Sequence, residues 1–576
     1  MADEKTQRLT VRCIPTEENM IISFLHGERQ TNLLRSQSES LGKSLGRIMN
    51  NIKKASQKGN KNKKMKRDDK TATGSDDIDV TLFIDNSKVS EELENKLAWK
   101  DGAVLEIGDN RYTVEKNPPT ILKLTLPQSI MSGFPVYPRV EMEFGNLGNS
   151  EFIWYKEVKS DLPIEECDEA VAMETSSTRS DSSIVAKKIL KIDITSSRVP
   201  ENWTEIHKGK FYMPTNSDIS HKLKLKCVPS DGTRSGEAKE VVSNSEVSAG
   251  VGVCPFETRH IYTQNKIGDE GLRVVSYNIL ADPYTSTEFA QNVLYPYCAP
   301  YALDIDYREQ LLLKELTGYN GDIVCLQEMG KRVYSTAFLP AFQLLGMEGR
   351  YTGKAGDIRE GEALFYRKDK FRMIAEYDVK LNDVVQNDPR HRKLFDKISE
   401  NKALVDKVLT RSAIVQVTIL ETLSEPKKKL CVANTHLYFH PRAAHIRLNG
   451  QDDLPIMLCG DFNSDAKHGV HKYVTTKSIP ANYADWFSAG KDEYCADITL
   501  NHDLEFKSAC GLLEYTNYVA GFKAAIDHIF VDGNFDVSQV IPMPTEEELS
   551  LHTALPSVVF PSDHIALICD LEWSKK

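Results

Sequence analysis

The sequence predicts a protein of the α/β class, in which a layered α/β domain over residues 270–574 follows a β-rich N-terminal region. Two observations point to this class. Short, nearly continuous apolar runs recur from residue 271 onward, for example at 430–433, and such runs are typical of strands buried on both faces. Helical stretches such as 307–316 lie between some of these runs, and strands that alternate with helices indicate a layered sandwich.

Composition narrows the class of protein before any motif is considered. Apolar residues make up 40% and charged residues 27% of the 576-residue chain, a balance typical of core-forming proteins. The formal net charge of −11 excludes a globally basic nucleic-acid-binding coat, although it allows local basic patches. No run of about 18 apolar residues predicts a membrane-spanning helix. The eleven cysteines form no Cys-x-x-Cys pair and fit a reducing compartment.

The N-terminal region, residues 1–158, is expected to be β-rich. The run 80–84 is β-branched and aromatic, and a Gly-Asp-Asn turn between 103–107 and 112–115 predicts a hairpin. A basic insertion at 43–70 carries eleven Lys or Arg against two Asp. We interpret it as a solvated, disordered segment, with an arm that binds RNA phosphates and a nuclear-localisation patch as the alternatives.

Two further segments precede the α/β domain. Residues 159–185 are acidic and rich in Ser and Thr, which predicts a linker. Residues 186–262 are expected to form a small β unit, because polar and apolar residues alternate over 221–227 as in a strand with one buried face. No set of residues in 1–262 suggests catalysis, so we expect an accessory region that positions a substrate or packs on the next domain.

The buried strands of the 270–574 domain each end in a carboxylate, an amide or an imidazole. Any one such residue is more often a cap or a turn former, but the same chemistry at seven strands is hard to obtain by chance. Strand ends at one rim of a sheet bring together residues that are distant in the sequence. The set comprises Asn278, Glu328, His436, Asp461, Asn463, Asp527, Asp563 and His564.

These residue types suit metal-assisted hydrolysis of a phosphate ester. Mg²⁺ prefers oxygen ligands, and Glu328 and Asp563 suit that role, whereas Zn²⁺ is a poorer fit because no His/Cys cluster has ligand spacing. Asp461 is the candidate for orienting or deprotonating the attacking water. The amide of Asn463 can donate to that water or to a phosphoryl oxygen without repelling it.

Two histidines complete the predicted chemistry. His436 and His564 can donate hydrogen bonds to the oxygens of the pentavalent phosphorane. An acidic partner would keep His564 protonated and oriented, and Asp527 is the candidate for that partner.

Six ordered motifs across residues 271–573 resemble those of the exonuclease–endonuclease–phosphatase superfamily. Further motifs at 277–282, 295–298, 434–438 and 515–518 resemble the poly(A) deadenylase branch, which is related to the yeast carbon-catabolite-repression nuclease. The resemblance implies a four-layer α/β sandwich. The six motifs are Ser276-Tyr277-Asn278, Leu326-Gln327-Glu328, Asn434-Thr435-His436-Leu437, Gly460-Asp461-Phe462-Asn463, Asp527-His528-Ile529-Phe530 and Ser562-Asp563-His564.

The resemblance also implies an activity, that of a metal-dependent phosphodiesterase. The expected enzyme is a Mg²⁺-dependent 3′ exoribonuclease, with Mn²⁺ as a possible substitute, which releases AMP from 2′,5′- and 3′,5′-linked oligoadenylates. Glu328 matches the metal-binding glutamate of the family, and His564 matches its final catalytic histidine. The candidate catalytic residues are Asp461, His564, Asn463, His436, Asn278 and Asp527, and the candidate metal-binding residues are Glu328, Asp461, Asn463 and Asp563.

Four aromatic residues are candidates for stacking on adenine, with core or rim packing as an equally weighted alternative: Tyr438, Phe439, Tyr518 and Phe522. The expected partner is single-stranded RNA or oligoadenylate, with no membrane and no obligate protein partner. The resemblance implies the mitochondrial matrix, but the first four residues include two acids and do not resemble an Arg-rich leader. A cytoplasmic location is therefore the alternative.

One connection departs from the family pattern. About eighteen residues join the predicted strands at 430–436 and 455–461, where the family has a full helix, and a parallel crossover needs a dozen or more residues and usually a helix. We hypothesise that a covering helix is lost and that stability or activity is reduced. The alternative functions are a catalytically impaired protein that binds RNA, and a phosphatase or endonuclease of the same fold.

Overall fold

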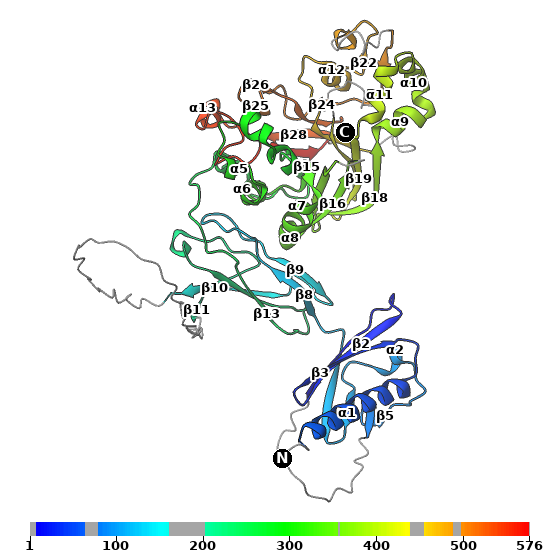
Figure 1. The fold of residues 1–576 in the computed structure, drawn as a ribbon. Helices are drawn as coiled ribbons and strands as arrows, with labels where there is room; N and C mark the ends of the chain where they lie inside the picture. Colours follow the sequence, from blue (N-terminus) through cyan, green and yellow to red (C-terminus); the bar gives the residue numbers. More distant parts are fainter. Residues whose placement is uncertain are drawn as a thin grey trace, which may run out of the picture. The chain divides into compact units, whose positions relative to one another are not determined.

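A computed structural model describes residues 7–63, 79–159, 202–354, 358–437, 454–487 and 497–574, and the chain falls into two compact units (Figure 1). The first unit comprises Met1–Thr125, Pro138–Phe152 and Lys226–Val241. The second comprises Leu126–Tyr137, Ile153–Leu225 and Val242–Lys576. Among the described residues, no helix is long and apolar enough to cross a membrane.

The first unit is built on a seven-stranded sheet with the strand order β3-β2-β1-β7-β6-β4-β5. Alternate residues face its core, so Leu9 and Val11 of β1 and Met20 and Ile22 of β2 are buried. The strands are β1 (Gln7–Arg12), β2 (Asn19–His26), β3 (Arg29–Ser36), β4 (Val80–Ile84), β5 (Ser87–Lys88), β6 (Val104–Ile107) and β7 (Asn110–Lys116), followed by the hairpin of β8 (Thr120–Thr125) and β9 (Arg139–Glu143).

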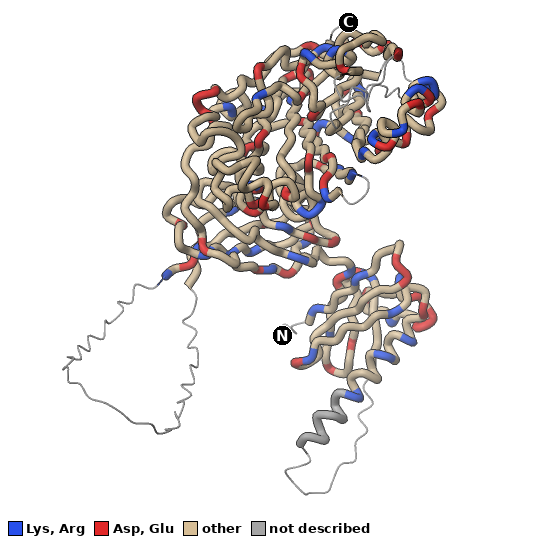
Figure 2. The backbone as a smooth tube through the Cα atoms, turned by 45° about the horizontal axis from the view of Figure 1, so that its top comes forward, with Lys and Arg blue, Asp and Glu red and all other residues tan. Residues whose placement is uncertain are grey.

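The basic insertion begins with a helix, α1 (Leu41–Lys63), so the predicted disorder is wrong for residues 43–63. Leu41, Leu45, Ile48 and Ile52 are buried in the core of the first unit, and their spacing of three or four residues places them on one helix face. Lys and Arg also occur along the described part of α1 (Figure 2). Counting charges alone did not detect the apolar face of this helix. Residues 64–70 of the insertion lie outside the described ranges.

A segment of the accessory half packs on helix α6 (Ile305–Gly318) within the second unit. Gln310 of α6 donates to the Ser129 hydroxyl at 2.9 Å and accepts from the Met131 backbone N–H at 3.1 Å. The Lys314 ammonium lies 4.6 Å from the ring centroid of Phe134. This part of the accessory half therefore packs on the α/β domain, which is one of the two roles predicted for the accessory region.

Two six-stranded sheets form the body of the second unit, with the orders β16-β17-β15-β14-β29-β28 and β18-β19-β20-β21-β27-β24. β14 pairs parallel with β15, and β20 pairs parallel with β21. Strands β20 and β21 therefore pair directly although the connection between them is short. Residues 438–453 of that connection lie outside the described ranges. The strands are β14 (Gly271–Asn278), β15 (Ile323–Gly330), β16 (Met347–Gly353), β17 (Glu360–Arg367), β28 (Phe535–Val540), β29 (Leu567–Trp573), β18 (Phe371–Lys380), β19 (Ile414–Thr422), β20 (Lys429–His436), β21 (Ile456–Asp461), β24 (Lys507–Ser508) and β27 (Asp527–Val531).

The two sheets share one core and carry helices on their outer faces. Val274 of β14 and Val432 of β20 are buried in the same cluster between the sheets. On the outer face of the first sheet, Phe365 of β17 stacks on Phe342 of α8 (Leu339–Leu344), with ring centroids 4.3 Å apart. On the outer face of the second, Phe530 of β27 packs in a cluster with α12 (Gly469–Thr476). The predicted four-layer α/β sandwich is confirmed.

Smaller elements surround this sandwich. Helices α9, α10 and α11 group together beside β18 and β19 (Figure 1). The hairpin of β25 and β26 follows the long loop after β24. The remaining bounds used below are α4 (Asp282–Thr285), α7 (Lys331–Val333), α9 (Leu381–Asn387), α10 (Arg392–Ser399), α11 (Lys402–Thr410), β22 (Ser478–Ile479), β23 (Leu500–Asn501), β25 (Asn517–Val519), β26 (Phe522–Ala524) and α13 (Glu546–Ser550).

Candidate active site

Strand register brings three of the predicted residues side by side at one rim of the second sheet. His436 at the end of β20 pairs with Asp461 at the end of β21, and Asp461 pairs with Asp527 at the start of β27. Gly460 permits the close approach of these strands, because a Cβ at this position would lie 1.9 Å from the Thr435 carbonyl oxygen. The polar strand ends that the sequence singled out are therefore aligned by backbone pairing.

Asn278 joins the rim of the first sheet to that of the second. Its amide nitrogen donates to Glu328 Oε1 at 2.9 Å and to Asp461 Oδ2 at 3.0 Å, and it lies 3.4 Å from His564 Nε2. Its side-chain oxygen accepts from the Leu280 backbone N–H at 3.1 Å, which fixes the orientation of the amide. Residues from both sheets thus meet at one buried amide group.

Glu328 reaches this centre through an irregularity in β15. The pairing of β15 with β17 shifts between Leu326 and Met329, and such a bulge re-aims a side chain. Glu328 itself has a left-handed φ of 59°, which is costly for a residue with a long side chain. Its second oxygen accepts from the Ala281 backbone N–H at 2.8 Å. Local strain that orients a buried carboxylate is typical of a functional site.

The two central carboxylates have strongly shifted pKa values. Burial raises the pKa of Glu328 to about 7, and the carboxylates of Glu360 and Asp563 add to the shift. Burial also raises the pKa of Asp461 to about 7, with a further contribution from Asp527. A divalent cation would stabilise the ionised forms of both groups.

Unsatisfied oxygens support the fit of a metal ion to this centre. The Oδ1 atoms of Asp527 and Asp563 are buried without a hydrogen-bond partner among the described residues. Glu328 and Asp461 add further carboxylate oxygens to the centre, and oxygen ligands are those that hard cations prefer. The residues therefore fit an oxygen-liganded divalent ion.

Asp527 and His564 form an oriented pair beside Asp461. Potential ligand atoms of the three residues lie within 4.8 Å of one another, but His564 Nδ1 is already hydrogen-bonded to Asp527 Oδ2 at 2.8 Å. The Thr516 hydroxyl donates to the same oxygen at 2.6 Å. Burial alone lowers the pKa of His564, but Asp527 and Asp563 outweigh it and raise the pKa well above the usual value. We therefore interpret His564 as an imidazolium, and not as a metal ligand.

His436 lies in the opposite electrostatic environment. The ammonium of Lys354 lies 3.2 Å from His436 Nδ1, and the side-chain amide nitrogen of Asn463 lies 3.2 Å from Nε2, so hydrogen-bond donors face both ring nitrogens. Burial lowers the pKa of His436 well below the usual value, and the charges of Lys354 and His564 lower it further. Asp461 Oδ2 lies 3.5 Å from His436 Nε2 and 3.7 Å from His564 Nε2. Asp461 thus lies near two imidazoles whose pKa values are shifted in opposite directions.

Asn463 and Asp563 lie at the edges of the centre. The Asn463 backbone N–H donates to Asp461 Oδ1 at 2.8 Å, and its side-chain amide donates to the Leu437 carbonyl at 2.7 Å. Asp563 Oδ2 accepts from the Tyr295 hydroxyl at 3.0 Å. The structure therefore brings together all eight residues that the strand ends predicted.

The aromatic candidates divide into two pairs. Tyr438 and Phe439 lie outside the described residues. Tyr518 of β25 and Phe522 of β26 belong to a hairpin that borders the site, since the Tyr518 backbone N–H donates to the Asp563 carbonyl at 3.0 Å. Phe522 is 50% exposed, so its ring is accessible, whereas the Tyr518 hydroxyl is held by Glu546 at 3.2 Å.

Sequence reasoning missed three residues that contact the site. Tyr295 and Thr516 lie in the stretches 295–298 and 515–518, which served only to recognise the branch of the superfamily. Lys354 follows β16 in a connection without any motif, and only the structure shows that it contacts both His436 and Glu360.

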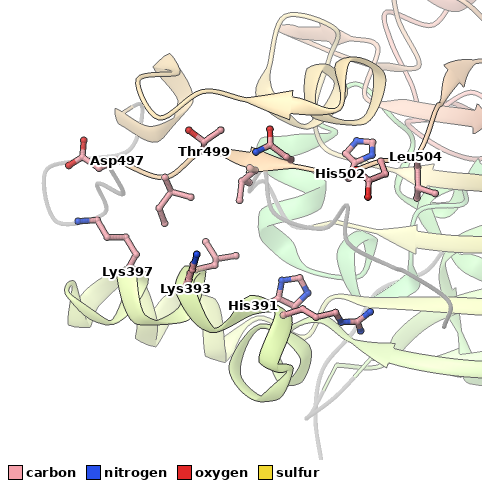
Figure 3. Close-up of a pocket in the computed structure, with 13 residues that line it drawn as sticks. His391, Lys393, Lys397, Asp497, Thr499, His502 and Leu504 are labelled. Atoms are coloured by element: carbon pink, nitrogen blue, oxygen red, sulfur yellow. The ribbon is translucent and has the colours of Figure 1, made fainter. Parts of the chain in front are cut away.

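Two large cavities lie in the described part of the second unit, besides smaller ones such as that bordered by Asp527. One, of ≈ 1110 Å³, is adjacent to the centre, because Lys354 and Glu360 line it. The other, of ≈ 630 Å³, lies between α10 and residues 497–504 and contains none of the predicted site residues (Figure 3).

Comparison with known proteins agrees with the fold. The model of the Endonuclease/Exonuclease/phosphatase family matches residues 275–564, and that of the 2′,5′-phosphodiesterase 12-like N-terminal domain matches residues 118–248. The sequence is 42% identical to 2′,5′-phosphodiesterase 12 of Rattus norvegicus, over 98% of this chain and 94% of the relative.

More distant relatives match the C-terminal half. The CCR4-Not complex 3′-5′-exoribonuclease subunit Ccr4 of Schizosaccharomyces pombe is 30% identical over 52% of this chain and 49% of its own length. The crystal structure of ANGEL2, a 2′,3′-cyclic phosphatase, is 21% identical, covers 53% of this chain and 96% of its own, and has a TM-score of 0.43. The resemblance inferred from the motifs is confirmed: the chain is an enzyme of the nuclease and phosphodiesterase class and belongs to the 2′,5′-phosphodiesterase 12 family of the endonuclease/exonuclease/phosphatase superfamily.

Proposed function

We propose that this protein is a Mg²⁺-dependent 3′ exoribonuclease that releases AMP from 2′,5′- and 3′,5′-linked oligoadenylates. The observation that carries the proposal is the buried centre in which Asn278 joins Glu328 to Asp461, and in which Asp461 Oδ2 lies 3.5 Å from His436 Nε2 and 3.7 Å from His564 Nε2. Kinship supports the substrate class, because relatives over nearly the whole chain are named 2′,5′-phosphodiesterase 12 and a more distant one is a 3′-5′-exoribonuclease subunit.

Glu328 is the proposed principal ligand of the metal ion, with Asp461, Asn463 and Asp563 as further candidates. When bound, Mg²⁺ neutralises charge on the phosphate and on the leaving oxygen. Mn²⁺ accepts the same oxygen ligands and is the proposed substitute.

The side chains of this chain position the attacking water and hold the proton that it loses. Asp461 orients the water and accepts its proton as the water oxygen bonds to phosphorus. The bond from phosphorus to the preceding 2′ or 3′ oxygen breaks, and that oxygen takes up a proton from solvent. His436, through a ring N–H, and the imidazolium of His564 donate to the phosphoryl oxygens, where negative charge develops. Asp527 keeps His564 oriented for this role. The products are AMP and an oligonucleotide that is one residue shorter.

The direct test is AMP release from a 2′,5′-linked triadenylate, measured with Mg²⁺ and with EDTA. We expect release by the unchanged protein with Mg²⁺, none with EDTA, and none from Glu328→Ala. Glu547→Ala, which removes an exposed carboxylate on α13, is the matched control and should retain activity. A 3′,5′-linked triadenylate assayed in parallel measures the linkage preference.

Three results would contradict the proposal. Release of inorganic phosphate in place of AMP would indicate a phosphatase. Internal cleavage products without AMP would indicate an endonuclease. Binding of oligoadenylate without turnover, by a protein that melts cooperatively, would indicate the catalytically impaired RNA-binding alternative and a harmful effect of the short 436–461 connection.

A mitochondrial location, implied by the same resemblance, is part of the proposal. Fractionation of cells that express the chain with a C-terminal tag checks it. Protection of the tag from protease inside intact mitochondria is the expected result, and recovery in the cytoplasmic fraction would favour the alternative.

A further inference from the structure

The larger cavity opens beside the catalytic centre, and three connections of the first sheet line it. The described lining residues lie at 282–286 after β14, at 330–333 from the end of β15, and at 351–354 and 358–360 from the end of β16 to the start of β17, and the cavity has a volume of ≈ 1110 Å³. Lys354, whose ammonium lies 3.2 Å from His436 Nδ1, belongs to both the catalytic centre and the cavity wall. A strand of substrate that leaves the centre on this side therefore enters the cavity within the length of one side chain.

Positive charge dominates the lining. Lys331, Arg332, Lys354 and Arg359 line the cavity, and the acidic lining residues are Asp282 and Glu360. Glu360 is only 1% exposed and forms an ion pair with Lys354 at 2.7 Å. Arg332 lies 3.6 Å from Asp306, but both side chains are more than half exposed, and such surface pairs are weak. Because the chain as a whole has a net charge of −11, this local excess of cations indicates a site for an anionic ligand.

An aromatic ring complements these cations. Tyr284 on α4 is 43% exposed, and its hydroxyl donates to Glu360 Oε1 at 3.3 Å, which holds the ring at the boundary between centre and cavity. Tyr351 packs against Tyr334, with ring centroids 5.3 Å apart. Cations along a groove combined with an accessible ring are the usual features of a single-strand nucleic-acid subsite, since phosphates contact the cations and bases stack on the ring.

We propose that this cavity binds the nucleotides of a single-stranded oligonucleotide that precede the two residues flanking the cleaved bond. The inference rests on the proposed function and adds a length preference to it. Lys331 and Arg359 contact backbone phosphates, and Tyr284 stacks on a base. A dinucleotide ends before the cavity, whereas a tetranucleotide fills it.

The test compares hydrolysis of a dinucleotide and of a tetranucleotide, both 3′,5′-linked oligoadenylates. The readout is the ratio of kcat/KM for the tetranucleotide to that for the dinucleotide. In Lys331→Glu/Arg359→Glu we expect this ratio to fall by about tenfold or more, and the salt dependence of tetranucleotide binding to weaken by about 1.4 in log–log slope, as for two lost single-strand phosphate contacts. Tyr284→Ala should lower the ratio without changing the salt slope.

The second cavity supplies the matched control. Lys393 lies on α10 and lines that cavity with Lys397 and residues of the facing segment (Figure 3). Lys393→Glu changes the net charge in the same direction and should leave the ratio unchanged. An equal fall in Lys393→Glu would mean a general effect of charge and would overturn the proposal, as would an unchanged ratio in Lys331→Glu/Arg359→Glu.

Failure of the proposed function gives a different result. If the unchanged protein hydrolyses neither substrate, fluorescence anisotropy with a labelled tetra-adenylate still tests the cavity. Weaker binding to Lys331→Glu/Arg359→Glu but not to Lys393→Glu would support the subsite, and equal binding to all three proteins would overturn it.

Discussion

His436 and His564 lie at similar distances, 3.5 and 3.7 Å, from the same carboxylate oxygen of Asp461, yet their neighbours are opposite in charge. His436 faces the ammonium of Lys354, and His564 faces the carboxylate of Asp527. Burial together with Lys354 lowers the pKa of His436 well below the usual value, whereas Asp527 and Asp563 outweigh burial and raise the pKa of His564 well above it, so we infer one neutral and one positively charged ring. The comparison shows that residues behind the imidazoles determine what each can do, because titratable groups whose environments move their pKa values apart take different roles.

Asp527→Asn should cause the largest loss of activity, because it changes the group that faces His564. The amide keeps the size of the side chain but removes the charge that keeps His564 protonated, so we expect a loss of about 10²–10⁴-fold in kcat. Steady-state AMP release measures it. Asp536→Asn, at an exposed position of β28, is the control, and a similar loss in both variants would contradict the assignment.

Lys354→Met should have an intermediate effect, because it changes the group that faces His436. Without the ammonium, the pKa of His436 rises toward its usual value, so His436 becomes charged as the pH falls. We expect a loss of about 10–100-fold and an acidic limb of the kcat profile that moves to higher pH, measured on a dinucleotide.

Two further variants separate a positioning role of Lys354 from simple damage. Lys354→Arg keeps a charged donor and should restore much of the activity. Glu360→Gln removes the buried partner that Lys354→Met leaves unpaired, so the double variant tests whether that carboxylate causes the loss. An unchanged pH profile in Lys354→Met would show that Lys354 has no influence on His436.

Thr516→Val should have a smaller effect on the Asp527–His564 pair. Thr516 donates to the oxygen of Asp527 that also bonds His564, but the ion pair itself remains. We expect a loss of about tenfold or more in kcat with little change in KM, because the hydroxyl donates to Asp527 and also accepts from the backbone N–H groups of Ile526 and Asp527, and one such hydrogen bond contributes about 1–1.5 kcal/mol. Thr516→Ser, which keeps the hydroxyl, should restore activity, and failure to do so would contradict this role.

The smallest of these effects should be a pH-dependent change in the free energy of unfolding when a metal ion binds. Because the pKa values of Glu328 and Asp461 are raised to about 7 in the folded protein, the folded state binds more protons than the unfolded state between about pH 4 and 7, and stability without metal falls as the pH rises through that window. Mg²⁺ should therefore raise Tm by a few degrees at pH 8 and hardly at pH 5. Thermal melts with Mg²⁺ or EDTA check this, and an equal increase at both pH values would contradict it.

The sequence predicted the layers of the second unit and the residues at its rim, because buried strands have a strong apolar signal and end in polar groups. It could not predict the bulge that turns Glu328 inward, since a shift of register leaves no mark in composition. Lys354 was invisible for a similar reason: it lies in a connection and contacts His436 only through the tertiary fold. Charge counting failed for α1, where an apolar stripe lies among basic residues. The catalytic roles and the domain limits drawn from composition stay predictions.

Measuring the protonation states of His436 and His564 tests most directly whether their neighbours make one ring neutral and the other charged. Carbon-13 NMR of protein labelled at histidine Cε1, with His436→Gln and His564→Gln for assignment, reports it over a pH range. We expect the His436 resonance to be that of a neutral ring and the His564 resonance to be that of a protonated ring throughout pH 6–8. Two rings that titrate together near the ordinary pKa of histidine, about 6.5, would contradict it.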